Sequence, residues 1–270
     1  MTHRPKRIQP ESPVPVPMRE MVIRGQMLLP DGWSEATLVM EDGSIVHFSD
    51  SLEAVEPGTD VIEGLVFPGI MDMHTHLGDH GARGDLPPGL EETVFPGGLK
   101  HRFLSMESDE RIVSSIRSSL LELHHGATFV MDYREGGMKG LEQIDRAVYP
   151  DGPSVFSMGR PGGDVTLERL IDRADGLGIP SLSKELEDVR DIAKRKHKPF
   201  SIHASELFRE DIGGILDLAP DQLVHMVSGS KDDWKEVQKE NIPVVLCPRS
   251  NMAFNINVPL CELYGSGLDL

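Results

Sequence analysis

The feature that most constrains the fold of this chain is a regular alternation of short apolar segments and amphipathic segments from about Phe67 onward. The apolar segments have the length of strands, and the amphipathic segments have the length and periodicity of helices. Strands are predicted at residues 66–74, 127–132, 154–158, 176–182, 199–203, 222–225 and 242–247. Because parallel strands are usually joined by crossover helices, this alternation predicts an α/β fold built on a parallel sheet.

The segment that begins at Ser108 illustrates how the helices are predicted. Ser108 is a suitable N-cap, and Asp109 and Glu110 fall in the first turn, where negative charge interacts favourably with the helix dipole. The apolar face of this helix consists of Ile112, Val113, Ile116, Leu120 and Leu123. Gly126 predicts its end.

The chain before residue 67 has a different pattern. Residues 1–18 are polar and rich in proline, which predicts an extended tail. Short alternating strands follow at 21–24, 36–40 and 44–48, with turn sequences at 30–32 and 41–43. We therefore expect a tail (1–18), a small antiparallel β unit (19–66) and an α/β domain (67–270).

Composition excludes several classes of partner and location. Hydrophobic residues make up 39% of the chain, enough for a sizeable core, but no apolar run is long enough to span a bilayer. The net charge of −17, from 27 basic and 44 acidic residues, opposes binding to nucleic acid or to an anionic membrane and leaves a small molecule or a protein as partner. The amino terminus has no apolar block typical of a secretory signal, and two cysteines cannot form a disulfide framework, so we expect a cytoplasmic protein.

Two histidines define the first candidate site. His74 and His76 lie two residues apart at the end of an apolar strand, so their side chains leave the same face. Two neutral imidazoles in this arrangement can bind one metal ion. The alternative is a pair of polar residues at an ordinary strand end, which the buried strand and the Pro-Gly turn before it make less favoured.

Further polar residues end other predicted strands. His203 ends the strand at 199–203, Glu206 follows it, and His225 ends the strand at 222–225. Asp132 ends another strand and is a candidate for a supporting role. Each could instead be a hydrogen-bonded or solvated structural residue. In a (β/α) barrel, however, the carboxyl ends of the strands form the face where active sites are built.

The spacing of these motifs resembles the amidohydrolase superfamily. Pro68-Gly69, Asp72, His74 and His76 are similar to its first barrel strand. The motif from His203 to Glu206, His225, and the segment 244–251 resemble its cytosine-deaminase and chlorohydrolase-like branch. The resemblance implies a (β/α)8 TIM-type barrel, with residues 19–66 as the first half of a β-sandwich domain.

The resemblance also implies roles for individual residues. His74, His76 and His203 would bind one divalent ion, zinc or iron. Glu206 would transfer protons, and His225 would orient the attacking hydroxide or polarise the substrate. Four further residues are candidates for supporting the ligands or contacting substrate: Asp72, His80, Arg83 and Asn251.

The activity implied is hydrolysis of C–N bonds other than peptide bonds, by deamination or dechlorination of a nitrogen heterocycle. A cyclic amide or urea hydrolase of the same superfamily is one alternative, and it would need a second metal ion and a bridging carboxylate on the fourth barrel strand. A truncated, non-catalytic metal-binding fragment is another. The substrate would be a small molecule, and related enzymes often form homo-oligomers.

One departure from the family pattern concerns the eighth strand. The family takes a further metal ligand from an aspartate at the end of that strand, typically within Gly-Thr-Asp. The segment 264–270 resembles the lead-in to this strand, so Asp269 is expected near its start and away from the metal. The segment 67–270 is also shorter than the ~250 residues of a typical complete barrel. We therefore expect a barrel that is incomplete at its C-terminus.

Overall fold

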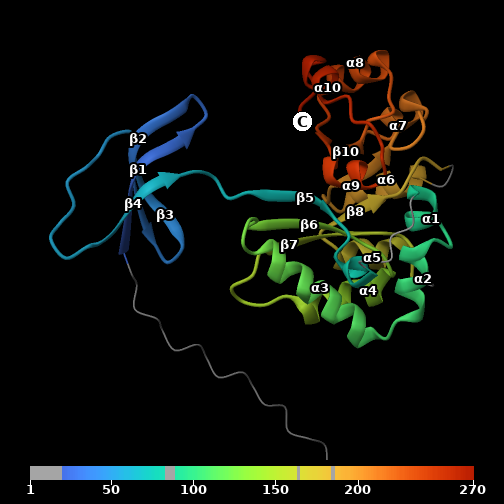
Figure 1. Cartoon of the computed structure of the whole chain (residues 1–270), viewed down its shortest axis with the longest axis horizontal. Coiled ribbons are helices and arrows are strands. Elements are labelled where there is room, and N and C mark those ends of the chain that lie inside the picture. Colours follow the sequence, from blue (N-terminus) through green and yellow to red (C-terminus); the bar gives the residue numbers. More distant parts are fainter. Residues whose placement is uncertain (1–19, 83–88, 163–164, 184–185) are drawn as a thin grey trace, which may run out of the picture. The chain divides into compact units, whose positions relative to one another are not determined.

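The computed structural model of the protein describes residues 20–82, 89–162, 165–183 and 186–270. The chain divides into two compact units, Met1–Pro68 and Gly69–Leu270. Each unit is built around its own sheet (Figure 1).

The first unit contains a four-stranded sheet in the order β3-β2-β1-β4. Its strands are β1 (Glu20–Leu29), β2 (Gly32–Glu41), β3 (Ser44–Ser49) and β4 (Asp60–Val66). β1, β2 and β3 are antiparallel neighbours, as predicted. The turn between β2 and β3 has positive φ angles at Asp42 (48°) and Gly43 (78°), the backbone that a tight hairpin requires.

The prediction of a purely antiparallel unit is wrong in one respect. β4 pairs with β1 in parallel, with Val22 opposite Val61. The residues between β3 and β4 carry the chain back to the start of β1, so β4 runs in the same direction as β1. The prediction that this unit is half of a β-sandwich stays a prediction.

The second unit contains a sheet of seven parallel strands in the order β11-β10-β9-β8-β7-β6-β5. The strands are β5 (Met71–Thr75), β6 (Phe129–Arg134), β7 (Ser154–Gly159), β8 (Gly176–Ile179), β9 (Phe200–Ala204), β10 (Gln222–His225) and β11 (Val244–Val245). Each predicted barrel strand has a counterpart. The first starts at Met71 rather than at residue 66, because residues 60–66 form β4 of the other unit.

Helices follow most of these strands. The helices are α1 (Leu90–Val94), α2 (Leu99–Met106), α3 (Asp109–Leu123), α4 (Gly137–Ala147), α5 (Leu167–Arg173), α6 (Leu186–Arg195), α7 (Ile212–Asp217), α8 (Lys231–Lys239), α9 (Pro248–Ala253) and α10 (Leu260–Gly265), with a 3-10 helix, η1 (Leu77–Ala82). α3 begins where predicted, because the Ser108 side chain accepts a hydrogen bond from the Arg111 amide (3.3 Å). Ile112, Ile116 and Leu120 of α3 are buried. Within the described residues, no helix combines the length and the hydropathy needed to cross a membrane.

Parallel strands that are covered by helices are buried on both faces, and β8 and β9 are buried at every residue. This arrangement confirms the predicted TIM-type barrel fold. The Val244 amide donates to the Asp269 carbonyl (2.8 Å), so Asp269 lies beside the first residue of β11, as expected for the start of a further strand.

Candidate metal centre and catalytic pocket

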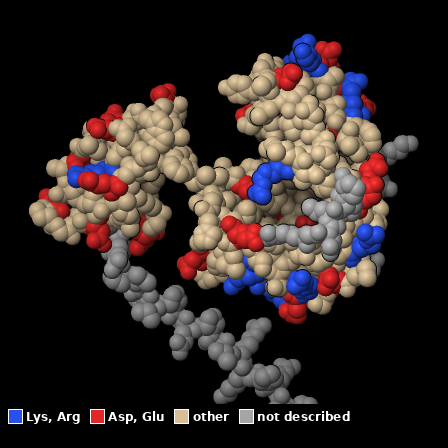
Figure 2. Space-filling model, viewed as in Figure 1, with Lys and Arg blue, Asp and Glu red and all other residues tan. Residues whose placement is uncertain are grey.

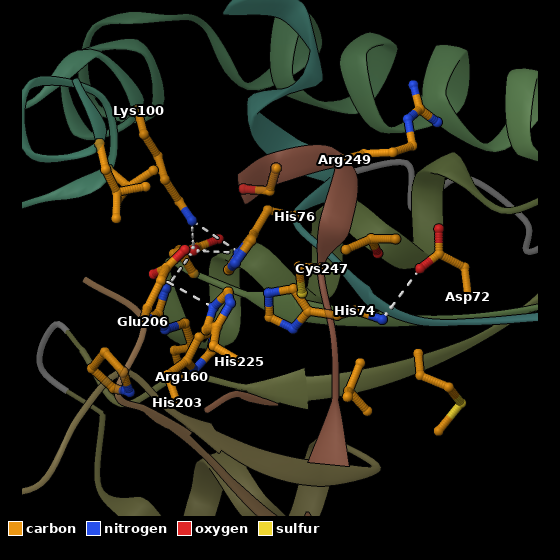
Figure 3. Close-up of a pocket in the computed structure, with 18 of the residues that line it drawn as sticks. Asp72, His74, His76, Lys100, Arg160, His203, Glu206, His225, Cys247 and Arg249 are labelled. Atoms are coloured by element: carbon orange, nitrogen blue, oxygen red, sulfur yellow. Dashed lines mark hydrogen bonds and ion pairs between the residues drawn. The ribbon is translucent and has the colours of Figure 1, made fainter. Parts of the chain in front are cut away.

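The carboxyl ends of β5, β9 and β10 bring three histidines together. The ring centroids of His74 and His203 lie 4.8 Å apart, those of His203 and His225 5.4 Å, and those of His74 and His225 5.6 Å. One ring nitrogen from each residue lies within 4.8 Å of the others. Figure 3 shows these side chains converging in the pocket. We refer to His74, His203 and His225 as the histidine cluster.

The donor atoms of the histidine cluster fit a divalent metal ion. His74 Nδ1, His203 Nε2 and His225 Nδ1 are buried and have no hydrogen-bond partner among the described residues. His203 Nδ1 lies 2.8 Å from the Ile179 carbonyl and donates its proton there, which leaves a lone pair on Nε2. Buried polar atoms without partners are rare in folded proteins, so three of them on neighbouring histidines indicate a ligand site.

The cluster is also in the protonation state that a metal requires. Burial lowers the pKa of His74 and His203 well below the usual value, and the neighbouring histidines, with Lys100 near His74 and Arg160 near His203, lower it further. Burial lowers the pKa of His225 to about 3. All three imidazoles are therefore neutral at pH 7, the form that binds zinc or iron.

His76 lies beside the histidine cluster but is not part of its tightest trio. Its ring centroid is 4.9 Å from that of His74. Its Nδ1 atom is 3.1 Å from the Tyr133 carbonyl, 2.9 Å from Glu135 Oε1 and 2.9 Å from Lys100 Nζ. The ligand set His74, His76 and His203 stays a prediction, since the closest trio contains His225 instead.

Glu206 lies next to the histidine cluster. Its Oε2 atom is 3.4 Å from His225 Nε2, and its carbonyl accepts a hydrogen bond from Ser228 Oγ (2.9 Å). Burial raises the pKa of the Glu206 carboxyl to about 7. A carboxyl group that titrates near neutral pH can both accept and release a proton during a reaction.

The backbone around Glu206 is held in an unusual conformation. Ser205, His225 and Met226 all have positive φ angles (50°, 79° and 57°), which cost about 1–3 kcal/mol each at residues other than glycine. The Ser205 amide donates to Glu210 Oε2 (2.6 Å), and the Met226 amide donates to the Ala204 carbonyl (2.9 Å). These hydrogen bonds fix the loops that carry the catalytic candidates.

Asp72 lies at the start of the same strand as His74. Its Oδ1 atom accepts a hydrogen bond from the His74 amide (3.2 Å), and burial raises the pKa of its carboxyl. Figure 3 shows this contact on the side of the pocket that also holds Arg249. Asp72 is therefore placed to support the strand end that carries the first histidine.

The remaining sequence candidates have different positions. His80, in η1, pairs with Glu122 at 3.4 Å, so the structure links it to α3. Asn251 is fully buried in α9, and within the described chain neither side-chain atom has a hydrogen-bond partner. Arg83 lies outside the described residues.

The structure adds a charged cluster that the sequence analysis did not identify. Lys100 Nζ lies 2.5 Å and Arg160 Nη1 lies 2.7 Å from the same atom, Glu135 Oε1. Burial alone would raise the pKa of Glu135, but Lys100, His76 and Arg160 together hold it well below its usual value. Glu135 and Arg160 directly follow β6 and β7, so their strand-end positions could have identified them. Lys100, on α2, had no comparable signal.

These groups open into a large cavity of about 1940 Å³. Cys247 and Arg249 line it, and burial raises the pKa of the Cys247 thiol to about 12. Apolar residues also line it: Leu90, Val94, Phe95, Leu207 and Phe208. Figure 2 shows the second unit hollowed, with acidic and basic side chains at the rim. A site that combines apolar walls with a few polar groups is typical of small-molecule binding.

Sequence comparison finds archaeal relatives. An uncharacterized protein of Methanocaldococcus jannaschii is 29% identical over 271 residues (88% of this chain, 70% of the relative). A putative aminohydrolase of Archaeoglobus fulgidus is 34% identical over 197 residues (71% and 57%), and one of Methanothermobacter thermautotrophicus is 28% identical over 282 residues (92% and 72%). No family model matches the chain.

Solved structures with a similar fold include an amidohydrolase, a triazine hydrolase, an atrazine chlorohydrolase and a guanine deaminase. A triazine hydrolase aligns with a TM-score of 0.70 at 16% identity, covering 93% of this chain and 70% of that one. The zinc complex of an atrazine chlorohydrolase from Arthrobacter aurescens aligns with a TM-score of 0.66 at 16% identity (92% and 70%). A guanine deaminase from C. acetobutylicum aligns at 0.53 and 15% identity (93% and 73%).

The fold is shared with these solved structures, and two of the archaeal relatives are putative aminohydrolases. The comparisons confirm the resemblance to the amidohydrolase superfamily, with an atrazine chlorohydrolase and a guanine deaminase among the structural relatives. The chain spans between 57% and 72% of the lengths of the three archaeal relatives.

Proposed function

We propose that this protein is a metal-dependent hydrolase of C–N bonds other than peptide bonds, and that it deaminates or dechlorinates a nitrogen heterocycle in the cytoplasm. One observation carries the proposal: a carboxyl group with a pKa of about 7, on Glu206, lies beside neutral histidines whose buried nitrogens have no described partner. The two free cysteines support the cytoplasmic location.

The histidines His74, His76 and His203 would hold one divalent ion, zinc or iron. Bound there, the ion would supply Lewis acidity and make water a nucleophile at neutral pH. His203 is oriented for this role by the Ile179 carbonyl, and Asp72 supports the backbone of His74.

Glu206 would perform the proton transfers. As water adds to the ring carbon that bears the amino group, the Glu206 carboxylate takes a proton from the water. When the C–N bond breaks, the same carboxyl group returns that proton to the departing nitrogen, and ammonia is released. His225, 3.4 Å from Glu206, would orient the water or polarise the substrate.

The test is Glu206→Gln in the full-length protein. The change keeps the shape of the side chain but removes proton transfer, so kcat for ammonia release should fall by about 10²–10⁴-fold while metal content stays unchanged. Ammonia and chloride release would be measured on cytosine, guanine and amino- and chloro-triazines. Glu110→Gln, which changes an exposed carboxylate paired with Arg146, is the control and should retain activity. Unaltered turnover in Glu206→Gln would contradict the assigned role.

The cyclic amide or urea hydrolase is the competing function. It would need a second metal ion and a bridging carboxylate on the fourth strand of the barrel, which is β8. β8 consists of Gly-Leu-Gly-Ile and offers no carboxylate, which favours a single ion. Metal analysis of the purified protein separates the two, because one ion per chain supports the deaminase and two support the alternative.

A non-catalytic metal-binding protein is the remaining alternative. The strand-eight aspartate of the family pattern motivates it, since Asp269 lies beside Val244 at the start of β11 and is not expected to fill that role. A full-length protein that binds one ion but hydrolyses none of these substrates would favour this alternative.

A further inference from the structure

We propose that Glu135 is a positioning residue that, opposed by Lys100, selects the tautomer of His76. In the selected tautomer Nδ1 carries the proton, and Nε2 keeps the lone pair with which His76 would bind a metal ion. The inference rests on the proposed metal site. It concerns a residue that neither the sequence motifs nor the comparisons identify.

Three groups compete for the Nδ1 atom of His76. The Tyr133 carbonyl lies 3.1 Å away, Glu135 Oε1 2.9 Å away and Lys100 Nζ 2.9 Å away. Figure 3 shows the Lys100 side chain extending toward His76. All three distances allow a hydrogen bond.

The three groups require different tautomers. A carbonyl and a carboxylate can only accept, so they favour a proton on Nδ1. An ammonium group can only donate, so a hydrogen bond from Lys100 requires a bare Nδ1 and places the proton on Nε2. A neutral histidine has one ring proton, and the two arrangements therefore exclude each other.

The Glu135 carboxylate decides this competition in favour of Nδ1–H. Its Oε1 atom lies 2.9 Å from His76 Nδ1 and 2.5 Å from Lys100 Nζ, so the ammonium has a charged partner closer than the imidazole. Lys100 is 4% exposed and the Glu135 side chain 14%, so water screens these contacts weakly. Arg160, 2.7 Å from Glu135 Oε1, holds the carboxylate in place from the end of β7.

The charged cluster of Lys100, Glu135 and Arg160 is less suited to bind an anionic substrate. Lys100 is engaged by Glu135 and lies 3.6 Å from Asp79, and Arg160 is engaged by Glu135. A substrate anion would have to displace a buried carboxylate that already pairs with both cations. Positioning of His76, in contrast, requires no change in the contacts that Glu135 makes with Lys100 and Arg160.

The first test reads the tautomer directly in the metal-free full-length protein. Long-range ¹⁵N–¹H NMR spectra of protein with ¹⁵N-labelled histidine distinguish Nδ1–H from Nε2–H, with His76 assigned by substitution. The wild type should show Nδ1–H, and Glu135→Gln should shift His76 toward Nε2–H. An Nε2–H tautomer in the wild type would overturn the proposal without any variant.

The second test measures Zn²⁺ affinity by competition with a chelator. Glu135→Gln should weaken binding by about 10–100-fold, the usual effect of losing a partner that orients a ligand. Lys100→Met should retain wild-type affinity, because it removes only the competing donor. The double variant should recover much of the affinity lost in Glu135→Gln, because the Tyr133 carbonyl then remains as the partner of Nδ1.

If Lys100 and Glu135 had a purely structural role, the Zn²⁺ affinities of the variants would follow the opposite pattern. Removing both buried charges would then be at least as damaging as removing Glu135 alone. Wild-type affinity in Glu135→Gln, reduced affinity in Lys100→Met, or no recovery in the double variant would each overturn the proposal. Circular dichroism and thermal melting check folding, and Glu110→Gln is the control. If Glu135→Gln does not fold, the tautomer of His76 in the wild type and the Zn²⁺ affinity of Lys100→Met still test the proposal.

The two proposals can fail separately. If the wild-type protein binds no zinc, the proposed metal site fails whatever the tautomer of His76. If zinc binds and Glu206→Gln abolishes turnover while Glu135→Gln changes nothing, only the positioning role of Glu135 fails.

Discussion

Tyr133 packs its ring against the histidine cluster. Its ring centroid lies 4.4 Å from that of His74 and 5.0 Å from that of His203. Its hydroxyl is 2.6 Å from Ser201 Oγ and accepts a hydrogen bond from Gln222 (3.0 Å). Tyr133 thus supports the histidine cluster with its ring, and its hydroxyl connects β6 to Ser201 of β9 and Gln222 of β10 by hydrogen bonds.

Changing Tyr133 to Phe should separate these two contributions. The ring remains, so Zn²⁺ affinity should stay unchanged, whereas Ser201 and Gln222 lose a buried partner and the free energy of unfolding should fall by about 1–3 kcal/mol. Chemical denaturation and zinc competition measure the two effects. Tyr264→Phe, at a residue that is 79% exposed, should change neither. A large loss of zinc affinity in Tyr133→Phe would contradict a supporting role for the ring alone.

Among the secondary-structure elements, β6 holds the end of β5 with side chains as well as backbone. The pairing of these strands is irregular between Asp72 and Thr75, where the histidine motif begins. Thr75 Oγ1 donates to the Met131 carbonyl (3.0 Å), and the Leu77 amide donates to Asp132 Oδ1 (2.7 Å). Asp132, a sequence candidate for a supporting role, therefore anchors the segment that follows His76.

Asp132 also lies beside the buried guanidinium of Arg134, and burial raises the pKa of its carboxyl group. Asp132 is fully buried, Arg134 is 1% exposed, and their side chains approach to 3.8 Å. Asp132→Asn leaves the guanidinium with Glu135 Oε2, at 3.4 Å, as its carboxylate partner and should lower the free energy of unfolding by about 1–3 kcal/mol. The matched change Asp145→Asn breaks the exposed pair with Arg173 and should cost no more than about 1 kcal/mol. Equal effects in denaturation experiments would show that burial of the first pair is unimportant.

For the whole molecule, the neutral histidine cluster makes the free energy of unfolding of the metal-free protein depend on pH. The folded-state pKa values of His74, His203 and His225 lie below the usual value, so the unfolded chain binds protons that the folded, metal-free protein does not. The contribution of these histidines to the free energy of unfolding is complete above pH 6.5 and is lost as the pH falls below that value. Glu206 acts in the opposite direction, because its raised pKa lowers stability as the pH rises from 4.5 to about 7.

The metal-free protein should therefore become less stable as the pH falls from 7.5 toward 5. Each buried histidine adds up to about 1.4 kcal/mol per pH unit, and we expect the three histidines together to outweigh the carboxyl groups with raised pKa values. These carboxyl groups are those of Asp72, Asp132, Glu206 and Glu210. Denaturant midpoints across this range measure the slope, and His225→Gln should reduce it by the share of one histidine. His124→Gln, at an exposed residue after α3, should leave the slope unchanged. Stability that rises on acidification would contradict the neutral state of the cluster.

The sequence determined the features that depend on local pattern. The alternation of apolar and amphipathic segments predicted a parallel sheet, and the position of His203 and His225 at strand ends predicted that they meet on one face. The N-cap Ser108 set the start of α3, where the structure confirms its hydrogen bond to Arg111. These features could be predicted because strand period, helix period and capping are properties of neighbouring residues.

Only the tertiary structure decided what depends on contacts between distant segments. The parallel pairing of β4 with β1 follows from the path of the chain rather than from the strand sequences. The pKa of Glu206 depends on burial, and the contacts around His76 depend on α2 and β6 bringing Lys100 and Glu135 to one imidazole nitrogen. Residue types and spacing identify which side chains can do chemistry, but burial and long-range contacts set their protonation, and no local pattern records these.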